Sequence, residues 1–538
     1  CGTALSSHEL AQGYENVKDL SIYAKFKIKG FPNAYFLAWT TTPWTLPGNV
    51  ALAVGKDIEY VEAKVGEEIL VLAKERLSVI GGEYEIVATH KGSEMVGMEY
   101  EPLYKFIPEN TIGLEKAYKI YDADFVNTQD GTGIVHTAVM YGQDDFELGT
   151  KIGLPKFHLV NEDGTFKKET EFLSGKFVKD EETAVEIIKD LAHRELLFKK
   201  EKYEHSYPHC WRCKTALIYY ARDSWYIKMS SLRDKLVKEN EKINWEPKHF
   251  KEGRFGEWLR EVKDWAISRE RYWGTPLPIW QNNNGEKMVI GSIDELKKFT
   301  KKSGNKYFVM RHGEAENNTR QILSAKEETL LHLTEKGIQD VGDVAKKIKG
   351  EKIDMIVSSP FVRTKETAEL MADFLGLDKK EIKYDKRIGE HNYGDFDEKP
   401  IQSYYDYYSS FEEAFDKPLP NGGNYTDTKR RTGEFIYDLE KNFSNKNILI
   451  ITHESPAWLM FAAAYGLDRK ETMTLSPNDE SFLKNSEFKE LDFVPLPHNE
   501  NYELDLHRPY IDEVELQNER GEKLTRTKEV MDVWFDSG

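Results

Sequence analysis

Short apolar runs alternate with turn residues along the first two hundred positions of the chain. The runs AYFLAWTT at 34–41, YEIVATH at 84–90 and KFHLV at 156–160 predict β-strands, and Gly-rich stretches such as QDGTG at 129–133 predict turns. This pattern predicts a β-rich globular domain with some helix over residues 21–195.

A different pattern follows from residue 307 to about residue 468, where short apolar runs alternate with longer helical stretches. Strands are expected at YFVM (307–310), MIVSS (355–359) and ILIIT (448–452), with helices starting at Thr334, Pro360 and Pro456. Such alternation is typical of an α/β domain with a mainly parallel sheet. Upstream, EGRFGEWLREVKDWAIS at 252–268 predicts one continuous helix.

Length and composition narrow the class of protein. A chain of 538 residues is too long to fold around a single hydrophobic core, and its length predicts about three or four domains. The net charge of −18 argues against a general basic coat for nucleic acid but leaves room for a local basic channel. Three cysteines indicate a reducing, cytoplasmic setting. The longest nearly apolar run, Trp458–Tyr465, is too short to span a bilayer, so we expect no membrane partner.

Two motif sets are nested in the chain. The outer set begins with WTTTPWTLPGN at 39–49 and GTGIVHTAVMYGQDDFELG at 131–149, and it resumes with DLHRPYIDEV at 505–514 and DVWFDSG at 532–538. Between these parts lies VMRHGEAENN, followed by SSPFVRTKET, GEHNYGDF and IITHES. An interrupted pattern that resumes predicts a domain, here residues 303–499, inserted into an exposed loop of another.

The outer set carries a cluster of hydroxyl groups. Thr40, Thr41 and Thr42 follow a predicted strand, where they could hold a water or a ribose hydroxyl, although a run of β-formers explains them equally well. Over most of residues 1–300 and 500–538 the sequence resembles the isoleucyl-tRNA synthetase family, notably in the motifs above and in RERYWGTPLPIW. Valyl and leucyl relatives differ at the threonine run.

This resemblance implies an editing site that hydrolyses valine from isoleucine tRNA. Thr40, Thr41 and Thr42 would position the attacking water and the terminal ribose, Asp145 would bind the α-ammonium, and His136 would line the pocket. Two alternatives remain open: Asp145 as a helix N-cap and His136 as a core histidine.

The resemblance also implies a fold and ligands. We expect a multi-domain α/β protein with a β-rich editing domain, a partial class I Rossmann-type core at 196–302 and 500–538, and an inserted three-layer α/β domain. Isoleucine, valine, ATP with Mg²⁺ and isoleucine tRNA would be its ligands. The family's His-Ile-Gly-His signature is absent, and KMSSL at 228–232 reads as a loop-to-helix junction. We therefore expect a fragment of an isoleucine–tRNA ligase that deacylates but does not charge tRNA.

A zinc site is a further candidate. Cys210 and Cys213 have the two-residue spacing with which a pair of thiolates binds Zn²⁺. The resemblance implies Cys1, in a remnant segment at 1–20, as a third ligand, with the fourth place open or taken by His209 or water. The alternative is a reduced pair without metal.

The inner set places five charged or titratable residues after predicted strands and turns. Arg311 and His312 follow the first strand, Arg363 follows the second, Glu390 lies in GEHNYGDF and His453 follows the third. Because ligands of α/β sheets bind at the carboxyl ends of strands, these residues predict a phosphate site.

Residues 305–470 resemble the histidine phosphatase (phosphoglycerate mutase-like) superfamily. The resemblance implies His312 as the nucleophile of a phosphomonoesterase, Arg311, Arg363 and His453 as phosphoryl ligands, and Glu390 as the acid. Asn317 and Arg320 would add phosphate contacts. The phosphorylated substrate is unknown.

Two departures from that family's pattern leave alternatives open. Glu454 stands where a glycine is usual, and NGGNY at 421–425 replaces Gly-Glu-Ser. The insert could therefore bind without catalysing, and the whole chain could instead be a histidine phosphatase on a non-editing, RNA-binding scaffold derived from a synthetase.

Overall fold

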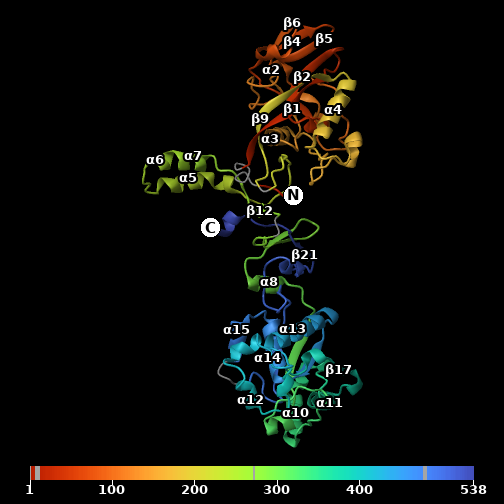
Figure 1. Cartoon of the computed structure of the whole chain (residues 1–538), viewed down its shortest axis with the longest axis vertical. Coiled ribbons are helices and arrows are strands. Elements are labelled where there is room, and N and C mark those ends of the chain that lie inside the picture. The colour runs from red at the N-terminus through yellow and green to blue at the C-terminus, as the bar shows by residue number, and fades with distance from the viewer. Residues whose placement is uncertain (1, 6–12, 212, 271–272, 477–480, 538) are drawn as a thin grey trace. The chain divides into compact units, whose positions relative to one another are not determined.

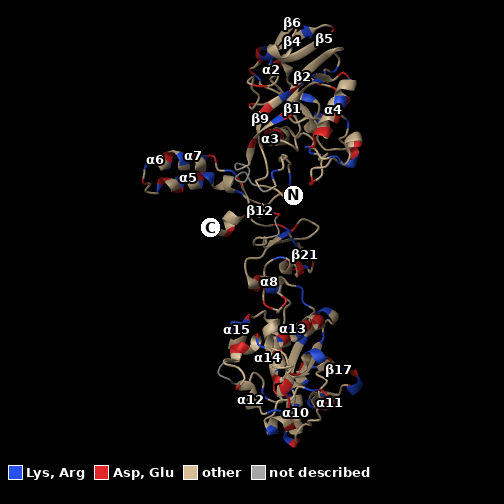
Figure 2. Cartoon of the chain, viewed as in Figure 1, with Lys and Arg blue, Asp and Glu red and all other residues tan. Residues whose placement is uncertain are grey.

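The computed structural model describes residues 2–5, 13–211, 213–270, 273–476 and 481–537. The chain divides into two compact units, Cys1–Ile267 and Ser268–Gly538. Charges of both signs are interspersed over the elements of each unit (Figure 2). None of the described helices is both long and apolar enough to cross a bilayer.

The first unit is built on a six-stranded sheet in the order β6-β4-β5-β2-β1-β9, whose strands are labelled in Figure 1. It also contains a three-stranded sheet, β7-β3-β8. Its strands are β1 (Tyr14–Lys27), β2 (Ala34–Thr40), β3 (Ala51–Val54), β4 (Glu59–Val65), β5 (Glu68–Ala73), β6 (Glu85–Lys91), β7 (Lys119–Asp122), β8 (Ile134–Thr137) and β9 (Leu197–Pro208). Its helices include η1 (Pro43–Gly48), α2 (Gly92–Met95), α3 (Gln143–Ile152) and α4 (Glu181–His193).

Most predicted strands of this unit are confirmed, and one is wrong. The runs at 34–41 and 84–90 form β2 and β6. KFHLV forms no strand: the backbone N–H groups of Leu159 and Val160 donate to the Tyr141 hydroxyl, and only Val160 makes an isolated bridge. The Tyr141 hydroxyl thus accepts the hydrogen bonds that the backbone of a neighbouring strand would otherwise accept.

The end of the first unit is a helical hairpin flanked by the two strands of a short pair. Its elements are β10 (Tyr226–Ile227), η5 (Met229–Leu232), α5 (Arg233–Glu241), α6 (His249–Glu252), α7 (Arg254–Arg260) and β11 (Trp265–Ala266). The loop-to-helix junction expected at KMSSL is confirmed, because η5 leads into α5. The single helix expected over 252–268 is wrong, since α7 ends at Arg260 and β11 pairs with β10.

The second unit contains the inserted α/β domain. Its first half comprises β12 (Ser268–Arg269), β13 (Ile279–Gln281), β14 (Lys287–Val289), α8 (Ile293–Phe299), β15 (Lys306–Arg311), α9 (Glu316–Arg320), α10 (Glu335–Ile348), β16 (Met355–Ser358), α11 (Val362–Leu375), β17 (Lys383–Tyr384) and α12 (Ile401–Tyr405). The second half comprises α13 (Tyr425–Asn442), β18 (Asn447–Thr452), α14 (Glu454–Ala464), α15 (Arg469–Thr474), β19 (Phe488–Leu491), β20 (Leu516–Gln517), β21 (Lys523–Arg526), β22 (Val530–Met531) and α16 (Val533–Ser537).

The inserted domain has three layers. Its sheet runs β17-β16-β18-β15-β19, and β15, β16, β17 and β18 are parallel. Side chains alternate between two cores: Tyr307 and Val309 pack with α13 and α14, whereas Phe308 and Met310 pack with α10 and α11. This period-two alternation explains why the strands are apolar throughout.

Helix starts in this domain follow local chemistry. The helix expected from Thr334 is confirmed as α10, and the Thr334 hydroxyl caps it by accepting the Gly337 backbone N–H. The predicted starts at Pro360 and Pro456 are displaced, because α11 begins at Val362 and α14 already begins at Glu454.

The chain segments on either side of the insert pair with each other. β13 pairs with β21 through Trp280 and Arg526, and Thr300 bridges Leu516. The insert therefore leaves and re-enters one small four-stranded sheet, β14-β13-β21-β20.

Candidate functional site

The threonine run lies where β2 ends and η1 begins. Thr40 is the last residue of β2, and its hydroxyl lies 3.2 Å from that of Thr42 and accepts from the Thr42 backbone N–H at 3.0 Å. Thr45, on η1, lies 3.4 Å from the Thr42 hydroxyl and donates to the Thr42 carbonyl at 2.9 Å. The hydroxyls thus form a continuous row.

The row ends at a buried histidine from β8. The Thr45 hydroxyl lies 3.0 Å from Nε2 of His136. The Thr45 hydroxyl donates its proton to the Thr42 carbonyl, so toward His136 it can only accept, and Nε2 of His136 is the donor. The neutral ring therefore carries its proton on Nε2, and Nδ1 is unprotonated. Nδ1 is buried with no hydrogen-bond partner among the described residues, and burial lowers the pKa of His136 to about 4.

Asp145 reaches the same strand from the first turn of α3. Its Oδ2 accepts the Ala138 backbone N–H at 3.1 Å, one residue beyond β8. Burial raises the pKa of Asp145 to about 7. The N-cap alternative is wrong, because Gly142 occupies that position.

Two of the predicted zinc ligands belong to the described part of the chain. Cys210 is buried and Cys213 is exposed, and neither forms a disulfide. The Thr215 hydroxyl, with the Cys210 thiol contributing, lowers the pKa of Cys213 to about 7. Cys1 lies outside the described residues, which contain no group of three or more metal-ligating side chains.

In the inserted domain, Arg363 joins two histidines. Its Nε donates to Nε2 of His312 at 3.1 Å, and its Nη2 donates to Nδ1 of His453 at 3.1 Å. The Ser324 carbonyl accepts from Nη2 at 2.9 Å. All three side chains are buried, with at most 2% of each residue exposed.

The arginine fixes both tautomers, because a guanidinium only donates. Nε2 of His312 therefore carries a lone pair, and its Nδ1–H donates to the Gly313 carbonyl at 2.7 Å. His453 carries its proton on Nε2, which donates to the Ser359 hydroxyl at 2.8 Å. Burial, followed by the charge of Arg363, holds the pKa of both histidines well below the usual range, so both are neutral.

Glu390 completes this group. Its Oε2 lies 3.9 Å from Nδ1 of His453, and its Oε1 accepts the His391 backbone N–H at 2.9 Å. Burial raises the pKa of Glu390, with Arg363 acting in the opposite direction. Burial thus favours the protonated form of this carboxyl, which is the form that a general acid needs.

The remaining predicted phosphate ligands take no part in the hydrogen bonds that join Arg363 to His312 and His453. Arg311 binds Glu454 and Ser481. Asn317 is buried, and its Oδ1 has no hydrogen-bond partner among the described residues. Arg320 is exposed and forms an ion pair with Glu316 at 3.5 Å.

Sequence reasoning missed four side chains that position these groups. They are Thr45 beside His136, Ser324 and Ser359 beside the Arg363 network, and Ser481 beside Arg311. Thr45 and Ser359 stand inside the motifs quoted above, so proximity in sequence could have identified them. Ser324 and Ser481 meet the site only through the fold.

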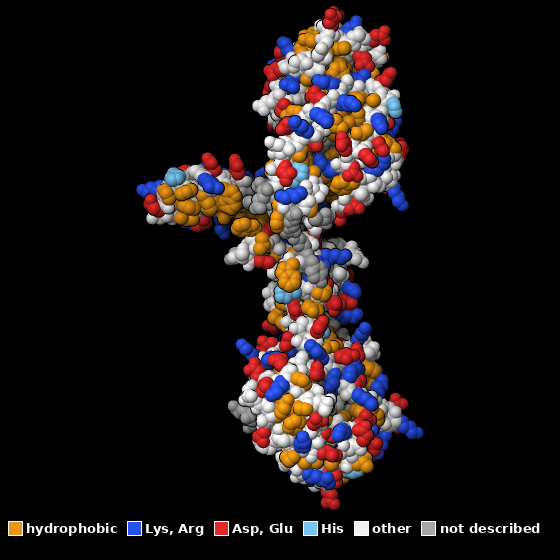
Figure 3. Space-filling model, in the orientation of Figure 1, with side chains coloured by type: hydrophobic (Ala, Val, Ile, Leu, Met, Phe, Trp, Pro, Cys, Tyr) orange, Lys and Arg blue, Asp and Glu red, His pale blue; other side chains and the backbone are white. Residues whose placement is uncertain are grey.

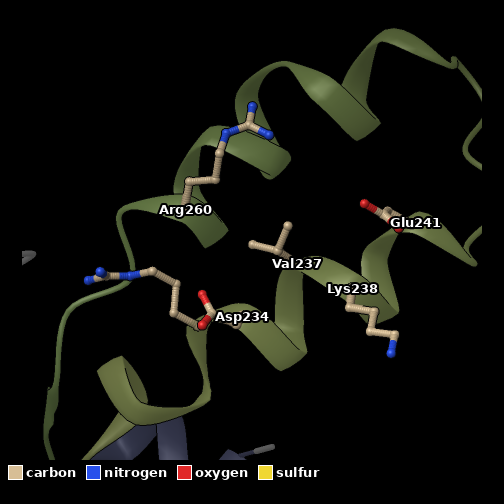
Figure 4. Close-up of a pocket in the computed structure, with 6 residues that line it drawn as sticks. Asp234, Val237, Lys238, Glu241 and Arg260 are labelled. Carbon is tan, nitrogen blue, oxygen red and sulfur yellow. The ribbon is translucent and has the colours of Figure 1, made fainter.

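A surface hollow of about 430 Å³ lies elsewhere, in the α5–α7 hairpin (Figure 4). Charged side chains of both signs line it together with Val237, and none of the predicted site residues does. The hairpin also exposes apolar side chains, including Ile243, Phe250 and Trp258 (Figure 3).

Family models match both parts of the chain. Residues 1–343 match the class I tRNA synthetases for isoleucine, leucine, methionine and valine, and residues 307–484 match branch 1 of the histidine phosphatase superfamily. The chain belongs to the class I tRNA synthetases and carries a histidine phosphatase domain. The two matches overlap at 307–343, where β15 and α10 are parts of the phosphatase fold.

Individual relatives and solved structures are similar to parts of the chain. The chain is 54% identical to isoleucine–tRNA ligases of Clostridium acetobutylicum, over 297 residues, and Clostridium tetani, over 299 residues. Each match covers 55% of this chain and 28% of the relative's length. A mycobacterial glucosyl-3-phosphoglycerate phosphatase structure covers 34% of this chain and 88% of its own, at 18% identity and a TM-score of 0.29.

Proposed function

We propose that the first unit edits valine mischarged onto isoleucine tRNA and that the whole protein is an isoleucine–tRNA ligase. Discrimination between isoleucine and valine is the standard example of a limit on binding, since one methylene contributes only ~1–3 kcal/mol. A second site that hydrolyses the wrong ester overcomes this limit. The observation that supports the proposal is the row of hydrogen bonds from Thr40 to His136.

The residues divide the chemistry of ester hydrolysis between them. The Thr40 and Thr42 hydroxyls are acceptors and donors for a water and a ribose hydroxyl. His136 offers its unprotonated Nδ1, which has no hydrogen-bond partner among the described residues, as an acceptor for a donor of the substrate, and its lowered pKa keeps it neutral. Asp145 ionises when an α-ammonium group arrives, because the ion pair offsets the cost of its burial.

Valyl-tRNA hydrolysis tests this proposal. The purified chain is expected to release valine from valyl-tRNA for isoleucine, and Asp145→Ala is expected to lose this activity. An unchanged rate in Asp145→Ala would refute the assignment. Activity in p-nitrophenyl phosphate hydrolysis without any deacylation would favour the alternative of a phosphatase on a non-editing scaffold.

We further propose that the inserted domain is a phosphomonoesterase that acts through a phosphohistidine. The Nε2 lone pair of His312 attacks phosphorus while the bond from phosphorus to the leaving oxygen breaks, and Glu390 gives its proton to that oxygen. Water then attacks the phosphohistidine, returns a proton to Glu390 and releases inorganic phosphate. Arg363 releases the two histidines and binds the phosphoryl oxygens. Its Nε–H and Nη2–H groups, which had donated to His312 and His453, then donate to those oxygens.

Turnover of p-nitrophenyl phosphate tests the second proposal. His312→Ala should abolish turnover, and acid-labile ³²P should label the wild type but not this variant. A wild type that binds phosphate without turnover would indicate a binding-only insert.

We also propose that the protein binds zinc and, for its ligase activity, ATP. Cys210 and Cys213 would supply two of the four ligands of a tetrahedral Zn²⁺ site, and the lowered pKa of Cys213 favours the thiolate that zinc requires. Isoleucine, ATP with Mg²⁺ and isoleucine tRNA would serve the ligase activity of the whole protein.

A further inference from the structure

The carboxylate that departs from the phosphatase family's pattern lies against the first arginine of the site. Arg311 ends β15, Glu454 begins α14, and Nη1 of Arg311 donates to Oε2 of Glu454 at 2.5 Å. Nη1 also faces the Ser481 hydroxyl at 3.0 Å and the Leu483 carbonyl at 2.9 Å. Its two N–H bonds therefore have three acceptors, so this nitrogen is fully used.

The carboxylate oxygens of Glu454 likewise already accept several hydrogen bonds. Its Oε2 accepts from Arg311 and from the Ser481 hydroxyl at 2.7 Å. Its Oε1 accepts the backbone N–H groups of Phe482 at 2.6 Å and Leu483 at 3.4 Å. Four donors occupy the lone-pair positions of one carboxylate, so Glu454 holds the segment 481–483 to Arg311 and has little capacity left for a substrate.

The other edge of the guanidinium remains for a ligand. Nε of Arg311 is buried and has no hydrogen-bond partner among the described residues. After burial and Arg363, Arg311 is the next charge that lowers the pKa of His312, so its guanidinium acts on the same phosphate site. An arginine anchored through Nη1 offers its Nε edge in a fixed orientation.

We propose that Glu454 is a positioning residue for phosphoryl transfer, which clamps Nη1 of Arg311 and presents the Nε edge to the phosphoryl oxygens. The inference rests on the proposed phosphatase function. Orientation matters most in the transition state, where charge spreads over the equatorial oxygens. Loss of the clamp therefore lowers kcat more than it raises KM.

Glu454→Gln tests the clamp with little change of shape. The amide places two donors where Arg311, Ser481 and two backbone N–H groups already donate, so it cannot satisfy all four. We expect kcat/KM for p-nitrophenyl phosphate to fall about tenfold, mostly in kcat, and inhibition by vanadate to weaken by a similar factor. Glu454→Asp should recover part of both, because a carboxylate remains.

A matched control and a double-mutant cycle separate positioning from general damage. Glu487→Gln changes a carboxylate that accepts the nearby Lys484 backbone N–H at 2.8 Å, and it should leave both constants unchanged. In an Arg311→Ala background, Glu454→Gln should have no further effect, because it acts through the missing guanidinium.

Two results would overturn the proposal. Higher kcat/KM in Glu454→Gln would mean that Glu454 competes with phosphate for Arg311, and a full additional loss in the Arg311→Ala background would mean that it acts elsewhere. A wild type without turnover would refute the phosphatase function instead. In that case calorimetric titration with inorganic phosphate tests whether Glu454 positions Arg311. Weaker phosphate binding by Glu454→Gln than by the wild type supports the proposal, and equal or tighter binding refutes it.

Discussion

Asp145→Asn separates a functional carboxylate from a structural one, because the two roles predict opposite effects on stability. Burial raises the pKa of Asp145 from 3.8 to about 7. Between these values the folded state binds a proton that the unfolded state has lost, so stability falls as pH rises from about 4 to about 7. Above pH 7 the carboxylate is charged in both states and the loss is complete.

The expected size follows from the shift. A change of about 3 pKa units, at about 1.4 kcal/mol each, gives about 4 kcal/mol as an upper estimate of this loss above pH 7. Asparagine avoids the buried charge, and its carbonyl can still accept the Ala138 N–H. Asp145→Asn should therefore stabilise the first unit at pH 8, have little effect at pH 5, and nevertheless lose valyl-tRNA hydrolysis.

Thermal unfolding at both pH values and a deacylation assay check this prediction. Asp144→Asn, a change at an exposed carboxylate in the same helical turn, serves as the control and should retain activity. If Asp145→Asn instead destabilised the protein by a similar amount at pH 8 and at pH 5, the carboxylate would have a structural role.

Three further changes probe the positioning residues. Thr45→Val leaves the Nε2–H of His136 without its acceptor, so we expect a loss of about 1–3 kcal/mol in unfolding free energy by denaturant titration, together with slower deacylation. Ser359→Ala removes the hydroxyl that accepts from Nε2 of His453 and leaves this buried donor unpaired, so kcat for p-nitrophenyl phosphate should fall about tenfold or more, while ¹⁵N NMR of the imidazoles should show a shifted Nε2 signal for His453. Cys213→Ser should lower the zinc content measured by mass spectrometry, with no change in phosphatase activity.

The sequence predicted the inserted domain well because its strands are buried on both faces. Uninterrupted apolar runs such as ILIIT leave little choice of structure, and parallel pairing brings their carboxyl ends to one edge. This pairing predicts that Arg363, His312 and His453 lie close together, and the structure joins them by hydrogen bonds.

Local patterns failed where tertiary contacts supply the hydrogen bonds. KFHLV has the composition of a strand, yet Tyr141 takes two of its backbone donors. The helix expected to continue beyond Arg260 gives way to a strand pair with Tyr226–Ile227, which lies more than thirty residues earlier in the chain. The extra carboxylate Glu454 was visible in the sequence, but its partner Ser481 was not, because only the fold brings segment 481–483 to Arg311.

The selectivity of ester hydrolysis tests the central claim most directly. The purified chain is incubated with isoleucine tRNA carrying either valine or isoleucine, and release of each amino acid is timed. Rapid loss of valine with isoleucine retained is the expected result. Equal rates for both esters, or no hydrolysis of either beyond the enzyme-free rate, would contradict an editing site built on Thr40, His136 and Asp145.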